Sequence, residues 1–349
     1  MKLKIGQVDL SFGQVELFPP NLKWDFMKWR HLWVGISLVL SLFSLLAIGI
    51  KGINYSIDFT GGVEVSMSMK HGLVSREKVI TTAHTAGVGE VEVTSISSVG
   101  KKSGGGYVLR VQRQKGMDEV QVSAAADKLS QKLRSEFGTE NIDLSYASIS
   151  GKVGKEEQMK GYMAVLLSLL SILIYVGWRF DTRFAPGAVI CLFHDVLIAL
   201  GVMTALGRPF SNTSIAAFLT IVGYSVTDTI IVYDRIREIG ALNPRMGLTE
   251  VVNKSINQTM SRTVLTQVTV LTALLVMVIW GGGAMFDFAL TMLIGVIIGS
   301  YSSIYVAAPL TLMLDSMLRR RGIVLSDGAK KKVEKDPNYI PPVIVRKRS

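Results

Sequence analysis

The stretch at residues 214–238, SIAAFLTIVGYSVTDTIIVYDRIRE, limits most strongly what this chain can fold into. About 20 apolar residues, at roughly 1.5 Å each, cross the hydrocarbon core of a membrane, and residues 214–233 meet that requirement. Asp228 lies inside this span, where a carboxylate costs roughly 2.5–3.5 kcal/mol. We therefore expect Asp228 to handle a proton. The simpler alternative is a satisfied carboxyl group that only fixes helix packing.

The composition of the chain is also that of a membrane protein. Of 349 residues, 49% are hydrophobic, and the one cysteine, Cys191, excludes an intramolecular disulfide and a four-cysteine zinc site. The first apolar run begins only near Leu32, behind a polar and aromatic head, and therefore predicts an uncleaved anchor. We expect a polytopic α-helical membrane protein with six transmembrane helices, at residues 32–50, 161–178, 185–206, 214–233, 263–280 and within 288–314.

The polar segment at residues 51–160, between the first two spans, has the pattern of a folded domain. Period-two alternation predicts strands, Ser75 and Asp118 are candidate N-caps, and Gly138 is a candidate helix stop. The glycine-rich run at 101–106 suits a hairpin between the middle strands. The expected order is βαββαβ, which predicts a ferredoxin-like α+β domain. Its elements are expected at about 63–69, 76–87, 91–96, 107–111, 118–137 and 142–146.

The positions of the basic residues predict the orientation. Lys and Arg concentrate in residues 1–31, 179–184, 234–262 and 315–349, whereas the short loops at 207–213 and 281–287 carry only Arg208. Because short basic loops stay on the cytoplasmic side, both termini are predicted to be cytoplasmic and the domain to face outward. The end of the head is expected to lie on the membrane surface. The basic, proline-containing tail is expected to be poorly ordered.

This orientation predicts that Asp228 and Arg262 lie at similar depth. Asp228 falls in the cytoplasmic half of the fourth span, and Arg262 stands at the cytoplasmic entrance of the fifth. A carboxyl balanced between burial and a nearby guanidinium can load and release a proton, and its two states favour different helix packing. The alternative for Arg262 is an interfacial anchor that reaches the lipid phosphates.

Other polar or small residues in the spans are weaker candidates. His194 and Asp195, in the third span, are either a secondary proton relay or a satisfied packing pair. Gly223, just before Asp228, allows close packing or bending, and Asp287 is expected to be interfacial. The sequence contains no GxxxxGK[ST], no HExxH and no nucleophile elbow, so it predicts no enzyme, no cofactor and no metal site.

Three motifs resemble those of the SecD/SecF family of bacterial protein-export membrane proteins, and of SecF members in particular. GYSVTDTIIVYDRIRE at 223–238 is similar to the fourth-span signature. IDFTGG at 57–62 resembles the DF-x-GG motif, and NQTMSRT at 257–263 resembles the segment before the fifth span. Together with six spans and one domain, the resemblance covers residues from about 20 to about 315.

The resemblance implies a member of the resistance-nodulation-division superfamily in the bacterial inner (plasma) membrane. Such an accessory subunit uses the proton motive force, with a SecD partner, to promote export and release of unfolded polypeptides at the outer face. It implies association with the SecYEG channel, and with YajC and YidC, contact with membrane lipids and no specific nucleic acid. Proton coupling falls on Asp228 and Arg262. In the motif, Asp58, Phe59, Gly61 and Gly62 form either a hinge to the domain or a rigid turn.

The sequence also leaves rival functions open. An intramembrane aspartyl protease is suggested by Tyr233-Asp234, but the partner motif is missing, and Asp287 is expected on the opposite side of the membrane from Asp234. A drug or lipid exporter half of the same superfamily is a second rival, and a passive scaffold of the translocon is a third. The coupled ion is either a proton or sodium.

Overall fold

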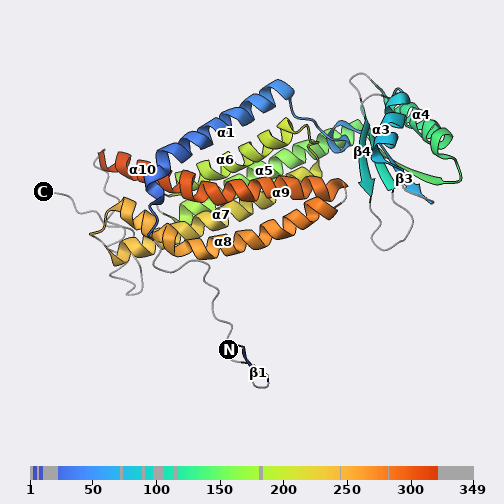
Figure 1. Ribbon diagram of the computed structural model, residues 1–349. Helices are drawn as coiled ribbons and strands as arrows, with labels where there is room; N and C mark the ends of the chain where they lie inside the picture. The colour runs from blue at the N-terminus through green and yellow to red at the C-terminus, as the bar shows by residue number, and fades with distance from the viewer. Residues whose placement is uncertain are drawn as a thin grey trace.

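The computed structural model describes residues 3–5, 8–10, 23–70, 74–88, 91–96, 106–113, 117–180, 184–243, 245–281 and 283–320. Figure 1 shows a long bundle of helices with a small sheet domain at one end. Two short antiparallel strands, β1 (Leu3–Ile5) and β2 (Val8–Leu10), lie near the N-terminus. Residues 101–105 of the predicted hairpin run at 101–106, and the tail beyond residue 320, lie outside the described residues.

Each predicted span is a helix in the structure. Within the described residues, six helices are long and apolar enough to cross a membrane. Several extend beyond their apolar stretch; α7, for example, starts at Asn212, directly after its cap Ser211, and ends at Leu242. The six are α1 (Arg30–Lys51), α5 (Gly151–Arg179), α6 (Ala185–Ala205), α7 (Asn212–Leu242), α8 (Leu248–Trp280) and a composite last helix. The last helix consists of α9 (Gly283–Ser302), a π-helical turn η2 (Ser303–Ala307) and α10 (Ala308–Arg320).

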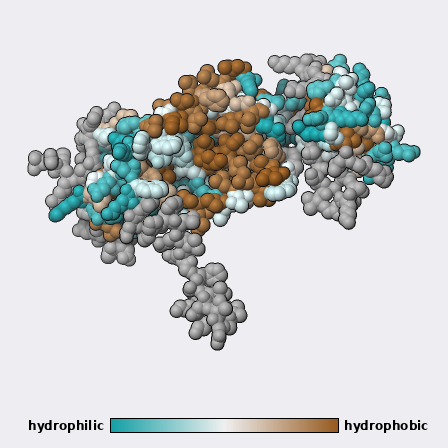
Figure 2. All heavy atoms as spheres, viewed as in Figure 1, coloured by the Kyte–Doolittle hydropathy of each residue, from teal (hydrophilic) through white to brown (hydrophobic). Residues whose placement is uncertain are grey.

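The six helices differ in how much of their surface they bury. Helices α6, α7 and the last helix are buried most, whereas α1, α5 and α8 turn most of their apolar side chains outward. Figure 2 shows the result as a broad hydrophobic surface across the middle of the bundle, with hydrophilic residues towards both ends. Because outward apolar side chains are stable only against lipid or another helix, the chain is a multi-pass membrane protein.

The sheet domain lies between α1 and α5 and confirms the predicted βαββαβ order. Its four antiparallel strands have the spatial order β4-β5-β3-β6, as in a ferredoxin-like sheet. Ser75 and Asp118 cap the two helices, and Gly138 ends the second one with φ +83°. The elements are β3 (Gly62–Met69), α3 (Arg76–Thr85), β4 (Val91–Ile96), β5 (Gly106–Gln112), α4 (Glu119–Phe137) and β6 (Ile142–Ile149).

The end of the N-terminal head packs against the bundle through the short helix η1 (Phe26–Trp29). The backbone amide of Trp24 donates to Asn257 Oδ1 (3.0 Å), and Asn257 Nδ2 donates to the Trp24 carbonyl (2.8 Å). Phe26 and Met27 are buried. Asn257 belongs to the NQTMSRT motif, so one residue of that motif holds the head on α8.

Candidate functional site

The middle of the bundle holds a buried carboxyl group on α7. Asp228 is only 4% exposed. Its Oδ2 accepts a hydrogen bond from Gln267 Nε2 on α8 at 2.6 Å. Gln267 Oε1 in turn accepts from the hydroxyl of Ser300 on α9. Asp228 thus begins a chain of hydrogen bonds that connects three transmembrane helices.

Gln267 was not among the residues expected from the sequence to act at this site. The signal was nevertheless present, because a glutamine inside an apolar span is itself costly and implies a partner. The Gln267 amide carries no charge and offers both a donor and an acceptor. Within the part of the chain that the structure describes, Asp228 therefore has an uncharged polar partner in direct contact and no permanent countercharge in direct contact.

Arg262 lies near Asp228 without touching it. Its side chain is on the exposed surface of α8, where electrostatic attraction to Asp228 still acts. Within the described residues, no ion pair joins the two. Gln267 occupies the direct contact instead, so proton coupling through Arg262 remains a prediction.

A second buried carboxyl group, Asp195, lies on α6 and is fully enclosed. Its Oδ1 is 2.9 Å from His194 Nδ1. Its Oδ2 accepts from Ser225 on α7 (2.6 Å) and from Ser302 on α9 (2.8 Å). Because Ser225 precedes Asp228 by less than one helical turn, both carboxyl groups are tied to the same part of α7.

The DF-x-GG motif forms a junction between the sheet domain and the bundle. It starts in the short helix α2 (Ile57–Thr60), where Asp58 Oδ2 accepts from the backbone amide of Asn212, the first residue of α7, at 3.1 Å. The ring of Phe59 is buried and packs on Phe210, with 5.7 Å between ring centroids. Asp58 therefore binds the N-terminus of the helix that carries Asp228, where a negative charge is favourable.

A side chain is disfavoured at both glycines of the motif, at Gly61 by the backbone conformation and at Gly62 by the lack of space. Gly61 ends α2 with φ +76°, a conformation that favours glycine. At Gly62, with φ +157°, a Cβ atom would lie 2.4 Å from the carbonyl oxygen of Val111 on β5. Gly154 on α5 also has no room for a side chain, because an added Cβ atom would lie 2.6 Å from the Phe59 carbonyl oxygen. The motif is thus tightly packed on both sides.

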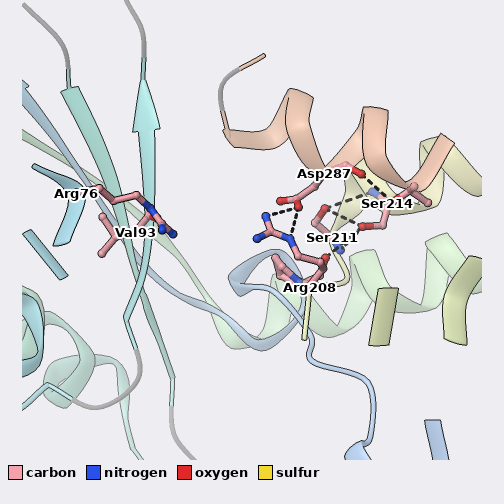
Figure 3. Close-up of polar contacts among 8 residues, drawn as sticks. Arg76, Val93, Arg208, Ser211, Ser214 and Asp287 are labelled. Carbon is pink, nitrogen blue, oxygen red and sulfur yellow. Dashed lines mark hydrogen bonds and ion pairs between the residues drawn. The ribbon is translucent and has the colours of Figure 1, made fainter. Parts of the chain in front are cut away.

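The remaining candidates occupy different places. Gly223 lies inside the unbroken α7, on its exposed face, and its carbonyl accepts from the Thr227 hydroxyl at 2.9 Å. Asp287 lies near the start of α9 and is buried inside the protein, while its expected place at the membrane interface stays a prediction. Figure 3 shows Arg208 pointing at Asp287, with Nε 2.7 Å from Oδ1, beside Ser211, which caps α7. Asp287 therefore has a permanent cation as its partner.

The fold defines a class: a multi-pass membrane protein with buried carboxyl groups in its bundle and a ferredoxin-like domain inserted after the first span. The family model for the protein export membrane protein SecD/SecF, C-terminal, matches residues 129–317, and the SecD/SecF GG motif matches residues 46–72. The chain therefore belongs to the SecD/SecF family.

Known relatives and solved structures agree with this assignment. The protein translocase subunit SecF of Rickettsia typhi is 36% identical over 84% of this chain and 92% of its own length. The SecF subunit of Rickettsia prowazekii is 36% identical over 89% of this chain and 98% of its own. The crystal structure of SecDF from Thermus thermophilus, described as translocon-associated, matches with a TM-score of 0.70 at 32% identity over 86% of this chain. This chain spans only 40% of that SecDF chain.

Proposed function

We propose that this chain is an accessory subunit of the Sec translocase in the bacterial inner membrane. With a SecD partner, it uses the proton motive force to promote export and release of proteins at the outer face. The relatives support a transport role, because they are named translocase subunits and not enzymes. The observation that carries the proposal is the buried Asp228, whose direct contact is the uncharged Gln267.

Protonation of Asp228 changes what its surroundings favour. In the ionised state the carboxylate attracts the Gln267 amide hydrogen and, at longer range, Arg262. In the protonated state that attraction is lost, and the neutral acid is tolerated by apolar neighbours. Helices α7 and α8 therefore prefer different packing in the two states, so that proton binding biases a two-state element.

The DF-x-GG motif provides a route from the membrane to the sheet domain. Asp58 holds the N-terminus of α7 through Asn212, and Gly62 is the first residue of β3. Movement of α7 relative to α8 thus pulls directly on the segment that enters the sheet. Gly61 and Gly62 permit the backbone change at this point, which is the hinge role that we propose for them.

A stripe of small residues on α7 supports the proposal that SecD binds to this chain. The stripe consists of Ala216, Thr220, Gly223 and Thr227, which share the exposed face of the helix. Small residues at such spacing let a second transmembrane helix approach closely. We propose that SecD packs on this stripe, close to Asp228. Contacts with SecYEG, YajC and YidC, and the cytoplasmic position of both termini, are further parts of the proposal.

Replacement of Asp228 tests the proposal in cells that depend on this chain. Asp228→Asn keeps the size of the side chain and its hydrogen bonding but cannot ionise. We expect the precursor of a signal-bearing protein to accumulate as it does in cells that lack the chain, while the variant remains at normal level in the membrane. Asp234→Asn, on the same helix, is the matched control, because Asp234 is 42% exposed and paired with Arg179; export should stay normal.

Normal export with Asp228→Asn would show that this carboxyl group carries no coupling and would favour the passive scaffold. The coupled ion is tested in the same assay by removing sodium or by collapsing the proton gradient. If export depends on sodium and not on the proton gradient, sodium is the coupled ion and the proton is not.

A further inference from the structure

A groove opens on the side of the bundle between α1, α6 and α10, at the end remote from the sheet domain. Its volume is about 920 Å³. Apolar side chains such as Leu38, Phe193 and Leu310 form much of its wall. The wall also carries polar and charged groups: Arg30, His31, Ser41, His194 and Asp315.

His194 lies on the wall of this groove and is 7% exposed. Its Nδ1 is bound to Asp195, while its Nε2 is buried without a hydrogen-bond partner in the described part of the chain. A buried polar atom without a partner costs about 1–3 kcal/mol, so such atoms usually contact ordered water. Nε2 is thus the ring nitrogen that still lacks a hydrogen-bond partner.

Asp195 lies behind His194 and has its remaining oxygen bound to Ser225 and Ser302. Other titratable or charged groups surround the pair on every neighbouring element. They are Cys191 on α6, Asp228 on α7, Tyr301 and Asp315 on the last helix, and Arg30 and His31 on α1. Of these, only residues of α1 and the last helix line the groove together with His194. Of the pair, His194 lines the groove, whereas Asp195 is fully buried behind it.

We propose that the groove is filled with water and that the His194–Asp195 pair is a second proton-binding site, separate from Asp228. A proton from water in the groove binds Nε2 of the neutral imidazole, and the imidazolium is held at Nδ1 by the Asp195 carboxylate. Release of the proton to water reverses the step. Ser225 and Ser302 hold the carboxylate in both states and tie the site to α7 and α9.

An acyl chain of a lipid fits the groove less well than water does. It would leave Nε2 of His194 without a partner, and it would cover Ser41 and the charged groups with hydrocarbon. The use of the site in protein export rests on the proposed function. The presence of water in the groove and the binding of a proton to His194 do not depend on that function. Both are measured without an export assay.

Cysteine labelling of the full-length chain in open membrane fragments tests the water. Ser41 lines the groove, whereas Leu42, one residue further along α1, is 58% exposed on the outer surface, so Ser41→Cys and Leu42→Cys form a matched pair. With a water-soluble maleimide, we expect Ser41→Cys to react at least about tenfold faster, because only a hydrated thiol ionises to the reactive thiolate. The unchanged chain gives the background from the buried Cys191.

Equal, slow labelling of both variants would mean that a lipid chain or a partner helix fills the groove, and the proposal would be wrong. Proton binding is measured by NMR of ¹⁵N-histidine in the same full-length chain, with His194→Gln to assign the signal. We expect the ¹⁵N signals of the His194 ring to change with pH as Nε2 gains and loses a proton. A ring that stays neutral throughout would overturn the second site.

These results separate the two proposals. If His194 titrates while Asp228→Asn leaves export intact, the second site stands and the proposed function fails. If His194 does not titrate while Asp228→Asn blocks export, the proposed function stands alone.

Discussion

The centre of the bundle and its domain-facing end both bury carboxyl groups, but the partners of these carboxyl groups differ in charge. Asp228 and Asp195 in the centre, and Asp287 at the end, are each at most 4% exposed. Asp287 is paired with the permanently charged Arg208, whereas Asp228 contacts an amide and Asp195 contacts a histidine. A fixed cation favours the charged state of a carboxylate, whereas an uncharged partner adds no such preference. The end is therefore suited to holding structure and the centre to exchanging protons.

The largest effect on stability is expected at the domain-facing end. Arg208→Gln leaves Asp287 buried without its cation, which should lower the free energy of unfolding by about 3–5 kcal/mol. Thermal melting of the purified full-length chain measures the loss. Combining Arg208→Gln with Asp287→Asn removes the uncompensated charge and should restore much of the stability. An unchanged melting temperature for Arg208→Gln would show that Asp287 does not need its cation, and the two regions would then not differ in this respect.

A smaller loss is expected in the centre. Gln267→Leu removes the hydrogen bond to Asp228 and should cost about 1–3 kcal/mol, less than at Arg208 because Asp228 can take up a proton instead. Export should fall as well, because the ionised state has lost its direct contact. Thr269→Val is the control, since Thr269 is exposed and its hydroxyl donates to the Thr266 carbonyl within its own helix. Normal export with Gln267→Leu would remove Gln267 from the coupling.

The smallest effect on stability is expected at the junction. Asp58→Ala removes the acceptor for the first amide of α7, and loss of such a cap costs typically about 1 kcal/mol. Asp58→Asn keeps an acceptor oxygen and should be nearly neutral in the same melting experiment. An export defect in Asp58→Ala that exceeds its small loss of stability would show that the junction transmits movement, in addition to holding the chain together.

Much of the sheet domain could be predicted from the sequence because its signals are local. Ser75, Asp118 and Gly138 each mark a helix end within a few residues of the hydrogen bond that they satisfy. Alternation in the strands likewise depends only on neighbours in the sequence. The exact register between strands came only from the structure, because it depends on pairing across the sheet.

The candidate site could be predicted only in part. Asp228 and Asp195 are evident because a carboxylate in an apolar span is costly by itself. Their partners Gln267, Ser225 and Ser302 lie on other helices, and the sequence does not specify how those helices are rotated against each other. Arg208 was missed as a partner for the same reason, because it lies 79 residues from Asp287.

The unbroken course of α7 has a mechanical consequence. The helix contains 31 residues and has no interruption between Asn212 and Leu242. Asp228 lies about 24 Å from Asn212 along the axis, at 1.5 Å per residue. A tilt of about 5° around Asp228 would move the far end by about 2 Å, similar to helix shifts in known switching proteins. Because the helix is long and unbroken, it can amplify a slight rearrangement around Asp228. The resulting displacement at Asn212, beside the start of the sheet, is large enough to break a hydrogen bond there.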